Sequence, residues 1–381
     1  MKIDDTFPRN YTELTVEQKE NRSTIVHNPE IDQCFSAIPI CIHIVNNHIH
    51  QLYQLDTFKR IKRVFDKELD NLLKTMTPFM EVQEPSRFDC EHRQVFLKAF
   101  KETVEPYLQG YDEYAFWQRQ PPFTYYKLDK DGNVVSQKEW AELVNDLIYA
   151  LSKYLNDSSF KQKRAERQRK AELQYNRAKR LVDALRAKYS KLLILRVDLC
   201  WKNQNLDELN LKKLKSTLSA FFKRFHHDPA LPKIVGYIWK LEFGQKKGYH
   251  YHCLFFLNGN KYKNDAHYAE QIGSYWCKFT QDQGFYFNCN RNRLAYRNLA
   301  IGMAEHTDQT MFDNLDKVLV YICKQDQFII DKHLSGIEVL RTFQTSAIPK
   351  PKPNDKHLGR PRNNSLPEIE TTELMELTTT P

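Results

Sequence analysis

Two strand-like segments in the second half of the chain constrain the fold more than any other feature. Residues 235–243 and 249–257 are rich in β-branched and aromatic side chains, which favour strands. Gly244 and Gly248 bracket the short break between them. The pattern therefore predicts an antiparallel hairpin.

The second of these segments carries His250 and His252, which project from the same face because they are two residues apart. A turn that sets Gly244 against Gly248 places Glu242 directly across from His250, on that same face. Two neutral imidazoles and a carboxylate suit a hard or borderline divalent cation that keeps open coordination positions. We therefore treat this face of the hairpin as a candidate metal site.

A simpler interpretation stays open on this pattern alone, because histidines in half-buried strands are often only packed. His48 and His50 have the same spacing in a segment expected to be helix or loop, with no acidic residue on a neighbouring strand. We expect no metal site there.

Composition limits the classes of protein that the chain can represent. The 381 residues are 41% hydrophobic and 13% aromatic, which suits folded domains. The sequence shows no apolar run long enough for a membrane span, no apolar signal core and no phosphate-binding Gly-x-x-x-x-Gly-Lys-Ser/Thr loop. Eight cysteines without a Cys-x-x-Cys pair favour reduced thiols, so we expect a cytoplasmic protein. The net charge of +9 favours an anionic partner.

Changes in pattern along the chain predict five segments. They are a loose tail at 1–30, a helical accessory domain at 31–156, a basic linker helix at 157–190, an α+β domain at 191–345 and a disordered tail at 346–381. In the accessory domain, apolar residues at three- and four-residue steps predict helices through Phe58, Ile61, Phe65 and Leu69, and from Trp140 to Leu151. No motif in this domain indicates a function.

The segment 161–188 carries many lysines and arginines around an apolar stripe that runs from Ala171 to Tyr189. This pattern predicts one long helix with cationic outer faces. A solvated linker is one interpretation. Contact with a phosphate backbone, packing on the next domain and dimerisation remain the others.

The α+β domain begins with an apolar strand at 192–200 in which Arg196 and Asp198 share a face. A helix capped at Asn205, the hairpin, a helix at 265–281, a strand at 284–287 and a final helix follow. This order predicts an antiparallel sheet with helices on one side.

The final helix carries the second motif, Tyr321-Ile-Cys-Lys324. Thr310 or Asp313 is the expected cap, and Lys317 lies one turn before Tyr321. A tyrosine in an apolar helix is most often a core residue. A strand with two histidines followed by a helix with Tyr-x-x-Lys is, however, a specific order of parts.

That order resembles single-tyrosine rolling-circle replication initiators of the HUH superfamily, and more particularly the inovirus-type replication proteins of the YagK/YfjJ-like family. The motifs that carry the resemblance are Leu195-Arg-Val-Asp-Leu199, Trp239-Lys-Leu-Glu242, Gly248-Tyr-His-Tyr-His-Cys-Leu-Phe-Phe256 and Tyr321-Ile-Cys-Lys324. They lie between about residues 192 and 327, well under half of the chain.

The resemblance implies an HUH endonuclease domain that holds Mg²⁺ or Mn²⁺ on His250, His252 and Glu242 and uses Tyr321 as the nucleophile, assisted by Lys324. Such an enzyme nicks and rejoins single-stranded DNA at an origin through a 5′-phosphotyrosine intermediate. It works in the cytoplasm of a bacterial host, alongside a host helicase and polymerase. Only one tyrosine lies in a matching motif, which disfavours a two-tyrosine mechanism. The DNA-binding candidates are Arg196, Asp198, Lys317, Arg291, Arg293, Lys246, Lys247, Arg360 and Arg362.

Arg360 and Arg362 belong to a Gly-Arg-Pro-Arg stretch that resembles the core of an AT-hook, or is a solvated linker. The aromatic candidates for stacking on bases are Tyr249, Tyr251, Tyr286 and Phe287. We expect stacking if they are exposed and a core role if they are buried. The alternatives to a replication initiator are a relaxase or transposase with the same chemistry, and a DNA-binding regulator whose site is vestigial. The sequence predicts no oligomeric state.

Overall fold

The computed structural model describes residues 29–79, 88–119, 124–202, 211–229, 231–244, 248–296, 298–324, 330–331 and 341–349. The helices and strands below belong to one compact unit, Met1–Ile348. The domain boundaries predicted inside this unit stay predictions. Both predicted tails lie almost wholly outside the described residues, as does the predicted cap Asn205.

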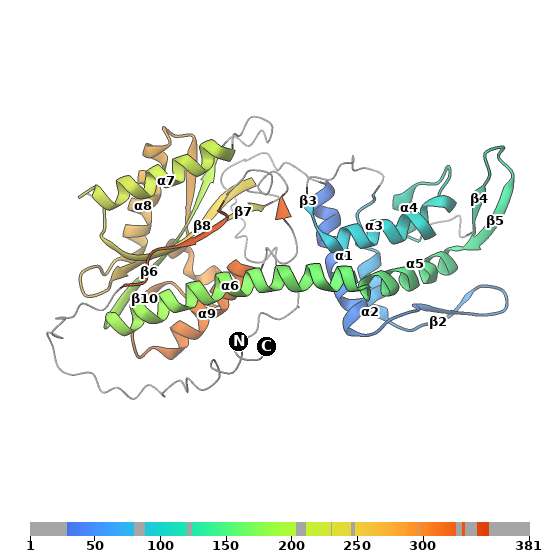
Figure 1. The fold of residues 1–381 in the computed structure, drawn as a ribbon, viewed down its shortest axis with the longest axis horizontal. Helices are drawn as coiled ribbons and strands as arrows, with labels where there is room; N and C mark the ends of the chain where they lie inside the picture. Colours follow the sequence, from blue (N-terminus) through green and yellow to red (C-terminus); the bar gives the residue numbers. More distant parts are fainter. Residues whose placement is uncertain are drawn as a thin grey trace, which may run out of the picture. The chain divides into compact units, whose positions relative to one another are not determined.

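The first part of the chain is a helical core with two protruding hairpins (Figure 1). Its helices are α1 (Pro29–Asn46), α2 (Lys67–Leu73), α3 (Glu91–Thr103), the 3₁₀ turn η1 (Glu105–Tyr107), α4 (Glu113–Trp117) and α5 (Trp140–Leu155). The hairpins pair β1 (Tyr53–Leu55) with β2 (Ile61–Val64), and β4 (Thr124–Leu128) with β5 (Val134–Glu139). The short strand β3 (Phe88–Asp89) pairs with β11 (Ile330–Asp331).

The helix predicted through Phe58, Ile61 and Phe65 is wrong. Instead, β1 and β2 form a hairpin whose loop contains Phe58, and the Phe58 side chain is 75% exposed. The carboxylate of Asp56 accepts the backbone N–H groups of Phe58 and Arg60. These two hydrogen bonds close the chain into a loop. They outweigh the helix-like spacing of the apolar residues.

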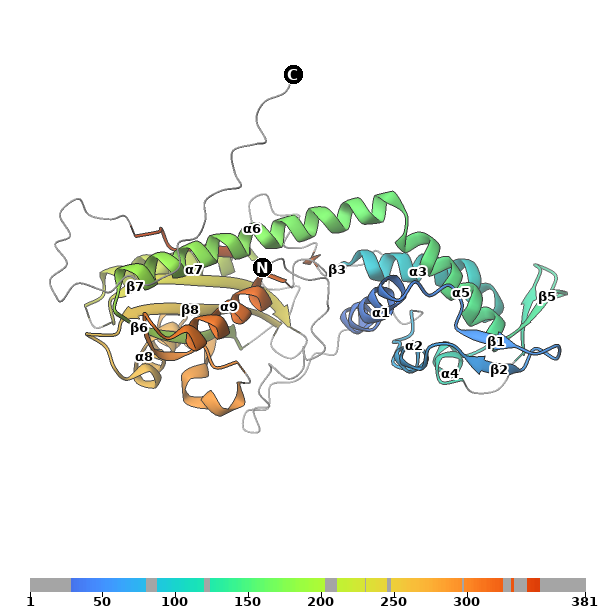
Figure 2. The same cartoon turned by 90° about the horizontal axis from the view of Figure 1, so that it is seen from below.

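The long helix α6 (Ser158–Lys188) has 31 residues, about 46 Å at 1.5 Å per residue. Its buried stripe includes Ala171, Tyr175 and Ala178, and it packs against α9 (Gln309–Lys324) and the sheet (Figures 1 and 2). The Tyr175 hydroxyl donates to Asp316 of α9 at 2.7 Å. This part of the helix is therefore a packed element of the sheet domain as well as a connection.

Among the described residues, six strands form an antiparallel sheet in the order β10-β6-β8-β7-β12, and β9 also pairs with β6. The strands are β6 (Lys191–Trp201), β7 (Ile234–Gly244), β8 (Gly248–Asn258), β9 (Gly284–Asn288), β10 (Gly302–Glu305) and β12 (Phe343–Thr345). The predicted mixed helix and sheet class with an antiparallel sheet is confirmed.

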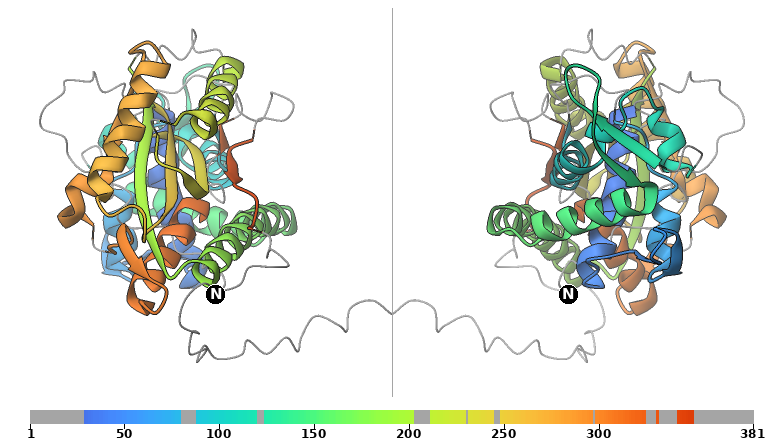
Figure 3. Two further views of the ribbon diagram at one scale, coloured as in Figure 1. Left: turned by 90° about the vertical axis from the view of Figure 1, so that its left-hand side faces the viewer. Right: turned by 90° about the vertical axis from the view of Figure 1, so that its right-hand side faces the viewer.

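Helices cover both faces of the sheet, so the prediction of helices on one side is wrong (Figure 3). One face packs on α7 (Leu211–His227) and α8 (Asp265–Phe279), and the other on α6 and α9. The cause is visible in β6, where neighbouring residues such as Leu192 and Leu193 are both buried although they point to opposite faces.

Candidate metal centre

The candidate cluster is assembled by the pairing of three neighbouring strands. The turn after β7 sets Gly244 against Gly248, which places Glu242 opposite His250 as predicted. On the other side of β8, Asp198 of β6 lies opposite His252. Since directly paired residues share a face, these four side chains lie on the face that α6 and α9 cover.

The three predicted ligands are close enough to share one ion. Ligand atoms of Glu242, His250 and His252 all lie within 4.8 Å of one another. His252 Nε2 is 3.1 Å from Glu242 Oε2 and 3.1 Å from His250 Nε2. All three residues are buried, and two imidazole nitrogens with a carboxylate oxygen form a donor set suited to a divalent cation. The cluster can therefore hold a metal ion.

Asp198 orients His252 from the side away from the cluster. Its Oδ1 atom accepts the Nδ1 hydrogen of His252 at 2.8 Å. Fixing the proton on Nδ1 leaves the Nε2 lone pair directed toward Glu242 and His250. Arg196 in turn approaches Asp198 Oδ1 through Nε at 3.4 Å, and both residues are buried.

The electrostatic balance of the cluster favours a positive charge. Burial lowers the pKa of His252, but the carboxylates of Asp198 and Glu242 outweigh burial and raise it above its usual value. Arg196 is affected in the same way: burial lowers its pKa, but the Asp198 carboxylate raises it overall. A proton on His252 and a bound cation are thus alternative ways to balance the carboxylates.

The predicted nucleophile, Tyr321, is half-buried on α9 and lies within electrostatic reach of the cluster. Burial raises its pKa well above the usual value, and the Glu242 carboxylate raises it further. Arg196 acts in the opposite direction. The phenol is therefore beside the charged face of the sheet, and it is neutral at neutral pH.

The cap of α9 differs from the prediction of Thr310 or Asp313. The helix begins at Gln309, and the Asp308 carboxylate accepts the Met311 N–H at 3.0 Å. Lys317 is exposed one turn before Tyr321. Lys324 is the last residue of the helix, and its side chain lies outside the described part of the structure.

The remaining DNA-binding candidates lie in different surroundings. Arg291 and Arg293 are exposed and pair with Glu270 and Asp265, respectively. Arg196 and Asp198 are buried beside the cluster, and their DNA-binding role stays a prediction. Lys246, Lys247, Arg360 and Arg362 lie outside the described residues.

The aromatic candidates divide between core and surface. Tyr249 and Tyr251 are buried in the core on the opposite face of the sheet, so they are structural. Tyr286 is half-buried and its hydroxyl donates to Glu270 at 2.6 Å. Phe287 lies opposite Asp198 and is half-buried on the cluster face.

Lys240 is a cluster-face residue that the sequence reasoning missed. It lies opposite His252 in β7, it is fully buried, and its Nζ atom donates to Gln174 of α6 at 3.2 Å. Its position two residues before Glu242 was a signal, because i and i+2 share a face of a strand.

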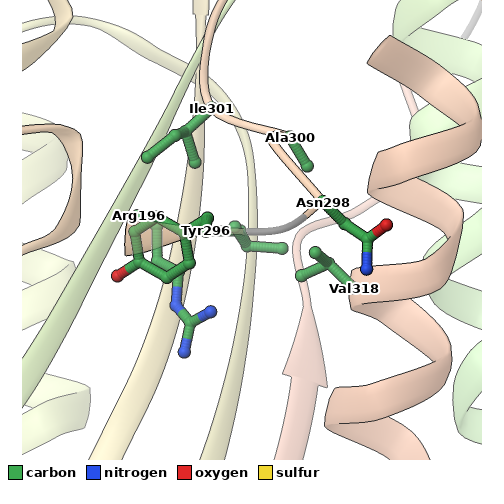
Figure 4. Close-up of a pocket in the computed structure, with 7 residues that line it drawn as sticks. Arg196, Tyr296, Asn298, Ala300, Ile301 and Val318 are labelled. Atoms are coloured by element: carbon green, nitrogen blue, oxygen red, sulfur yellow. The ribbon is translucent and has the colours of Figure 1, made fainter. Parts of the chain in front are cut away.

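Beside the cluster, Arg196 also borders a small pocket between β6, the segment before β10 and α9 (Figure 4). The Arg196 guanidinium lies over the Tyr296 ring, with its carbon 5.8 Å from the ring centroid. Asn298 and Val318 line the side toward the helix. Neither Tyr296 nor this pocket had a recognisable signal in the sequence.

The fold and the site together define an α+β protein with a buried Glu-His-His cluster able to bind a metal ion. Residues 155–335 match the family model of the YagK/YfjJ C-terminal domain, a range that contains the cluster and Tyr321. The match supports the resemblance to that family predicted from the motifs. Comparisons with curated proteins and with solved structures gave no match. No helix in the described ranges is both long and apolar enough to cross a membrane.

Proposed function

We propose that this protein is a metal-dependent DNA nicking-joining enzyme of the HUH class that initiates rolling-circle replication of a phage, prophage or plasmid. One observation carries the proposal. The phenol of Tyr321 lies beside the same charged face of the sheet that gathers Glu242, His250 and His252. A tyrosine nucleophile next to a site for a divalent cation is the arrangement that phosphodiester transfer requires.

The metal site would be held by the side chains of Glu242, His250 and His252. With Mg²⁺ or Mn²⁺ bound, the site would supply Lewis-acid chemistry at a non-bridging phosphate oxygen. Asp198 keeps His252 in the tautomer whose Nε2 lone pair faces the site. The chain's own contribution is therefore a preformed set of ligands with fixed orientation.

Tyr321 attacks the scissile phosphorus through its phenolic oxygen. The new bond joins that oxygen to phosphorus, the bond to the 3′-oxygen breaks, and the departing oxygen takes up a proton to become a free 3′-hydroxyl. The phenol loses its proton in this step, and Arg196 opposes the rise in the pKa of Tyr321. Lys317, exposed one turn earlier on α9, would bind an adjacent phosphate.

The covalent bond between Tyr321 and the 5′-phosphate preserves the phosphodiester energy. Attack on that bond by a 3′-hydroxyl reverses the first step, so the strand is rejoined without ATP. A replication initiator would work with a host helicase and polymerase, because no phosphate-binding loop for an NTPase occurs in the sequence.

The test is the formation of a covalent adduct. The full-length protein is incubated with Mn²⁺ and a tiled set of single-stranded oligonucleotides that cover the replicon encoding it. Each oligonucleotide is labelled at its 3′ end, because the 5′-phosphotyrosine stays with that fragment. We expect a labelled protein band on a denaturing gel, lost in Tyr321→Phe and in His250→Ala.

Tyr296→Phe is the matched control, since Tyr296 is another partly buried tyrosine beside Arg196. It should retain the adduct. If Tyr321→Phe retains the adduct instead, the nucleophile is another residue. If the wild-type protein binds the oligonucleotides but forms no adduct with any of them, the nicking activity is refuted.

A DNA-binding regulator is the second candidate, favoured by the exposed cations of α6, among them Lys161, Lys163, Arg169, Lys170 and Arg180. Together these residues would neutralise several phosphates along a duplex. Strong duplex binding in the absence of any adduct would support this candidate.

A further inference from the structure

The loops of the two protruding hairpins have the same backbone structure but different side chains. In the β1–β2 loop, Asp56 Oδ1 accepts the N–H groups of Phe58 at 2.8 Å and Arg60 at 2.9 Å. In the β4–β5 loop, Asp129 Oδ1 accepts those of Asp131 at 2.9 Å and Asn133 at 2.8 Å. The aspartate N–H also donates to the carbonyl four residues later in each loop, at 2.9 Å in both.

The fourth residue of each five-residue loop needs a positive φ. It is Gly132 in the second loop, with φ of 83°, and Lys59 in the first, with φ of 61°. Glycine adopts such angles freely, whereas a lysine there is uncommon. The Asp131-Gly132-Asn133 sequence of the second loop thus contains the glycine that this backbone favours. In the first loop, Phe58 stands where the second loop has Asp131, and the shared backbone does not require an aromatic side chain there.

The first loop holds an aromatic ring in solvent among cations. Phe58 is 75% exposed, and the Arg60 guanidinium lies 5.1 Å from the centroid of its ring. Directly after β2, the exposed Phe65 has the Arg63 guanidinium of that strand 5.5 Å from the centroid of its ring. Phe58 lies in a loop fixed by hydrogen bonds, and the Phe65 N–H donates to the Leu52 carbonyl at 2.9 Å. Aromatic rings on a backbone held in this way bind a partner with little loss of entropy.

The cations of this hairpin indicate the charge of its partner. Arg60 pairs with Asp56, and Lys59 pairs with Glu142. Lys62 and Arg63 are exposed and form no ion pair with any residue that the structure describes. Both cations belong to β2, which lies between Phe58 and Phe65 in the sequence, and their charges are available for an anion.

We propose that the β1–β2 hairpin binds single-stranded DNA, with unpaired bases stacked on Phe58 and Phe65 and phosphates held by Lys62 and Arg63. Every base has an aromatic face, so stacking on exposed rings combined with nearby cations is the chemistry that holds single strands without sequence preference. A paired duplex hides those faces. The β1–β2 hairpin (Figure 2) would hold a DNA strand independently of the metal cluster and of nicking.

The test measures binding of fluorescein-labelled oligothymidylate by fluorescence anisotropy, with the full-length protein in EDTA so that no cleavage can occur. Phe58→Ala should weaken binding roughly fivefold to a hundredfold, the effect of losing one stacked base. Lys62→Ala with Arg63→Ala should reduce the slope of log K against log salt by about 1.4, or about 0.7 for each phosphate contact.

A loop exchange provides a second variant that keeps the backbone. Thr57→Lys, Phe58→Asp, Lys59→Gly and Arg60→Asn install the sequence of the other loop and retain Asp56. This variant should fold and lose at least as much affinity as Phe58→Ala. Lys130→Ala, an exposed cation in the β4–β5 loop, is the matched control and should bind within about twofold of wild type.

Binding within about twofold of wild type by both Phe58→Ala and the loop exchange would overturn the proposal. An equal loss of affinity for a blunt duplex would overturn the assignment to single strands. Because EDTA removes metal-dependent chemistry, either result leaves the Tyr321 adduct assay as a separate test of nicking.

Discussion

The contact between Asp198 and His252 offers the sharpest test of the candidate metal centre. Asp198→Asn keeps the size of the side chain and an oxygen that can accept the Nδ1 hydrogen, but it removes the negative charge. The hydrogen bond is 2.8 Å long, and both side chains are less than a tenth exposed. Solvent screening of this contact is therefore small.

Two effects of different size should follow. Loss of such an outer carboxylate typically weakens metal affinity about 10- to 100-fold, or about 1.4–2.7 kcal/mol. Asp198 also balances the buried charge of Arg196, and breaking a buried ion pair costs about 3–5 kcal/mol of folding free energy. The asparagine retains a hydrogen-bond acceptor, so we expect a loss of stability of about 3 kcal/mol.

Isothermal titration of the full-length protein with Mn²⁺ at about pH 8, above the usual pKa of histidine, measures the first effect. Urea unfolding measures the second. Glu91→Gln is the matched control, because Glu91 is a buried carboxylate paired with Arg167 at 2.7 Å in the helical part of the chain. It should lose comparable stability and keep full Mn²⁺ affinity.

Mn²⁺ affinity of Asp198→Asn within about twofold of wild type, in protein that is demonstrably folded, would refute the orienting role of Asp198. A loss of affinity in Glu91→Gln as well would show that the effect follows stability rather than the hydrogen bond to His252.

Two other predictions concern protonation and packing. Asp198 and Glu242 raise the pKa of His252 above its usual value of about 6.5, so in the metal-free protein the His252 imidazole stays protonated to higher pH. Mn²⁺ needs the neutral imidazole, so apparent affinity should rise with pH just above about 6.5, with proton release measured by titration in buffers of different ionisation enthalpy. Binding without proton release in this range would contradict the assignment. Gly273→Ala should destabilise the protein by about 1–3 kcal/mol in urea unfolding, because a Cβ there would lie 2.0 Å from Cδ2 of Tyr286. Unchanged stability would show that Tyr286 can move aside.

Local sequence patterns were sufficient to predict the β7–β8 hairpin and its register. The glycines on either side of the turn fixed the pairing of β7 with β8, and a period of two then placed Glu242, His250 and His252 on one face. The apolar stripes of α6 and α9 likewise follow from spacing, because a helix buries residues three and four apart.

The same type of signal failed at Phe58. Its spacing with Phe65 fits a helix, yet the Asp56 carboxylate closes a loop by bonding two nearby N–H groups. Hydrophobic periodicity carries no information about such local capping, and Phe58 is left exposed as a result.

The sequence by itself determined which side chains could gather on one face of a hairpin, since that depends on neighbours in the chain and on the alternation of a strand. Only the tertiary structure decided that Asp198 and Arg196 lie beside His252, because β6 reaches β8 across more than fifty residues. The same holds for Tyr321, which approaches the cluster only because α9 packs on that face of the sheet. Such contacts depend on how distant apolar surfaces are buried together, and no local pattern encodes that pairing.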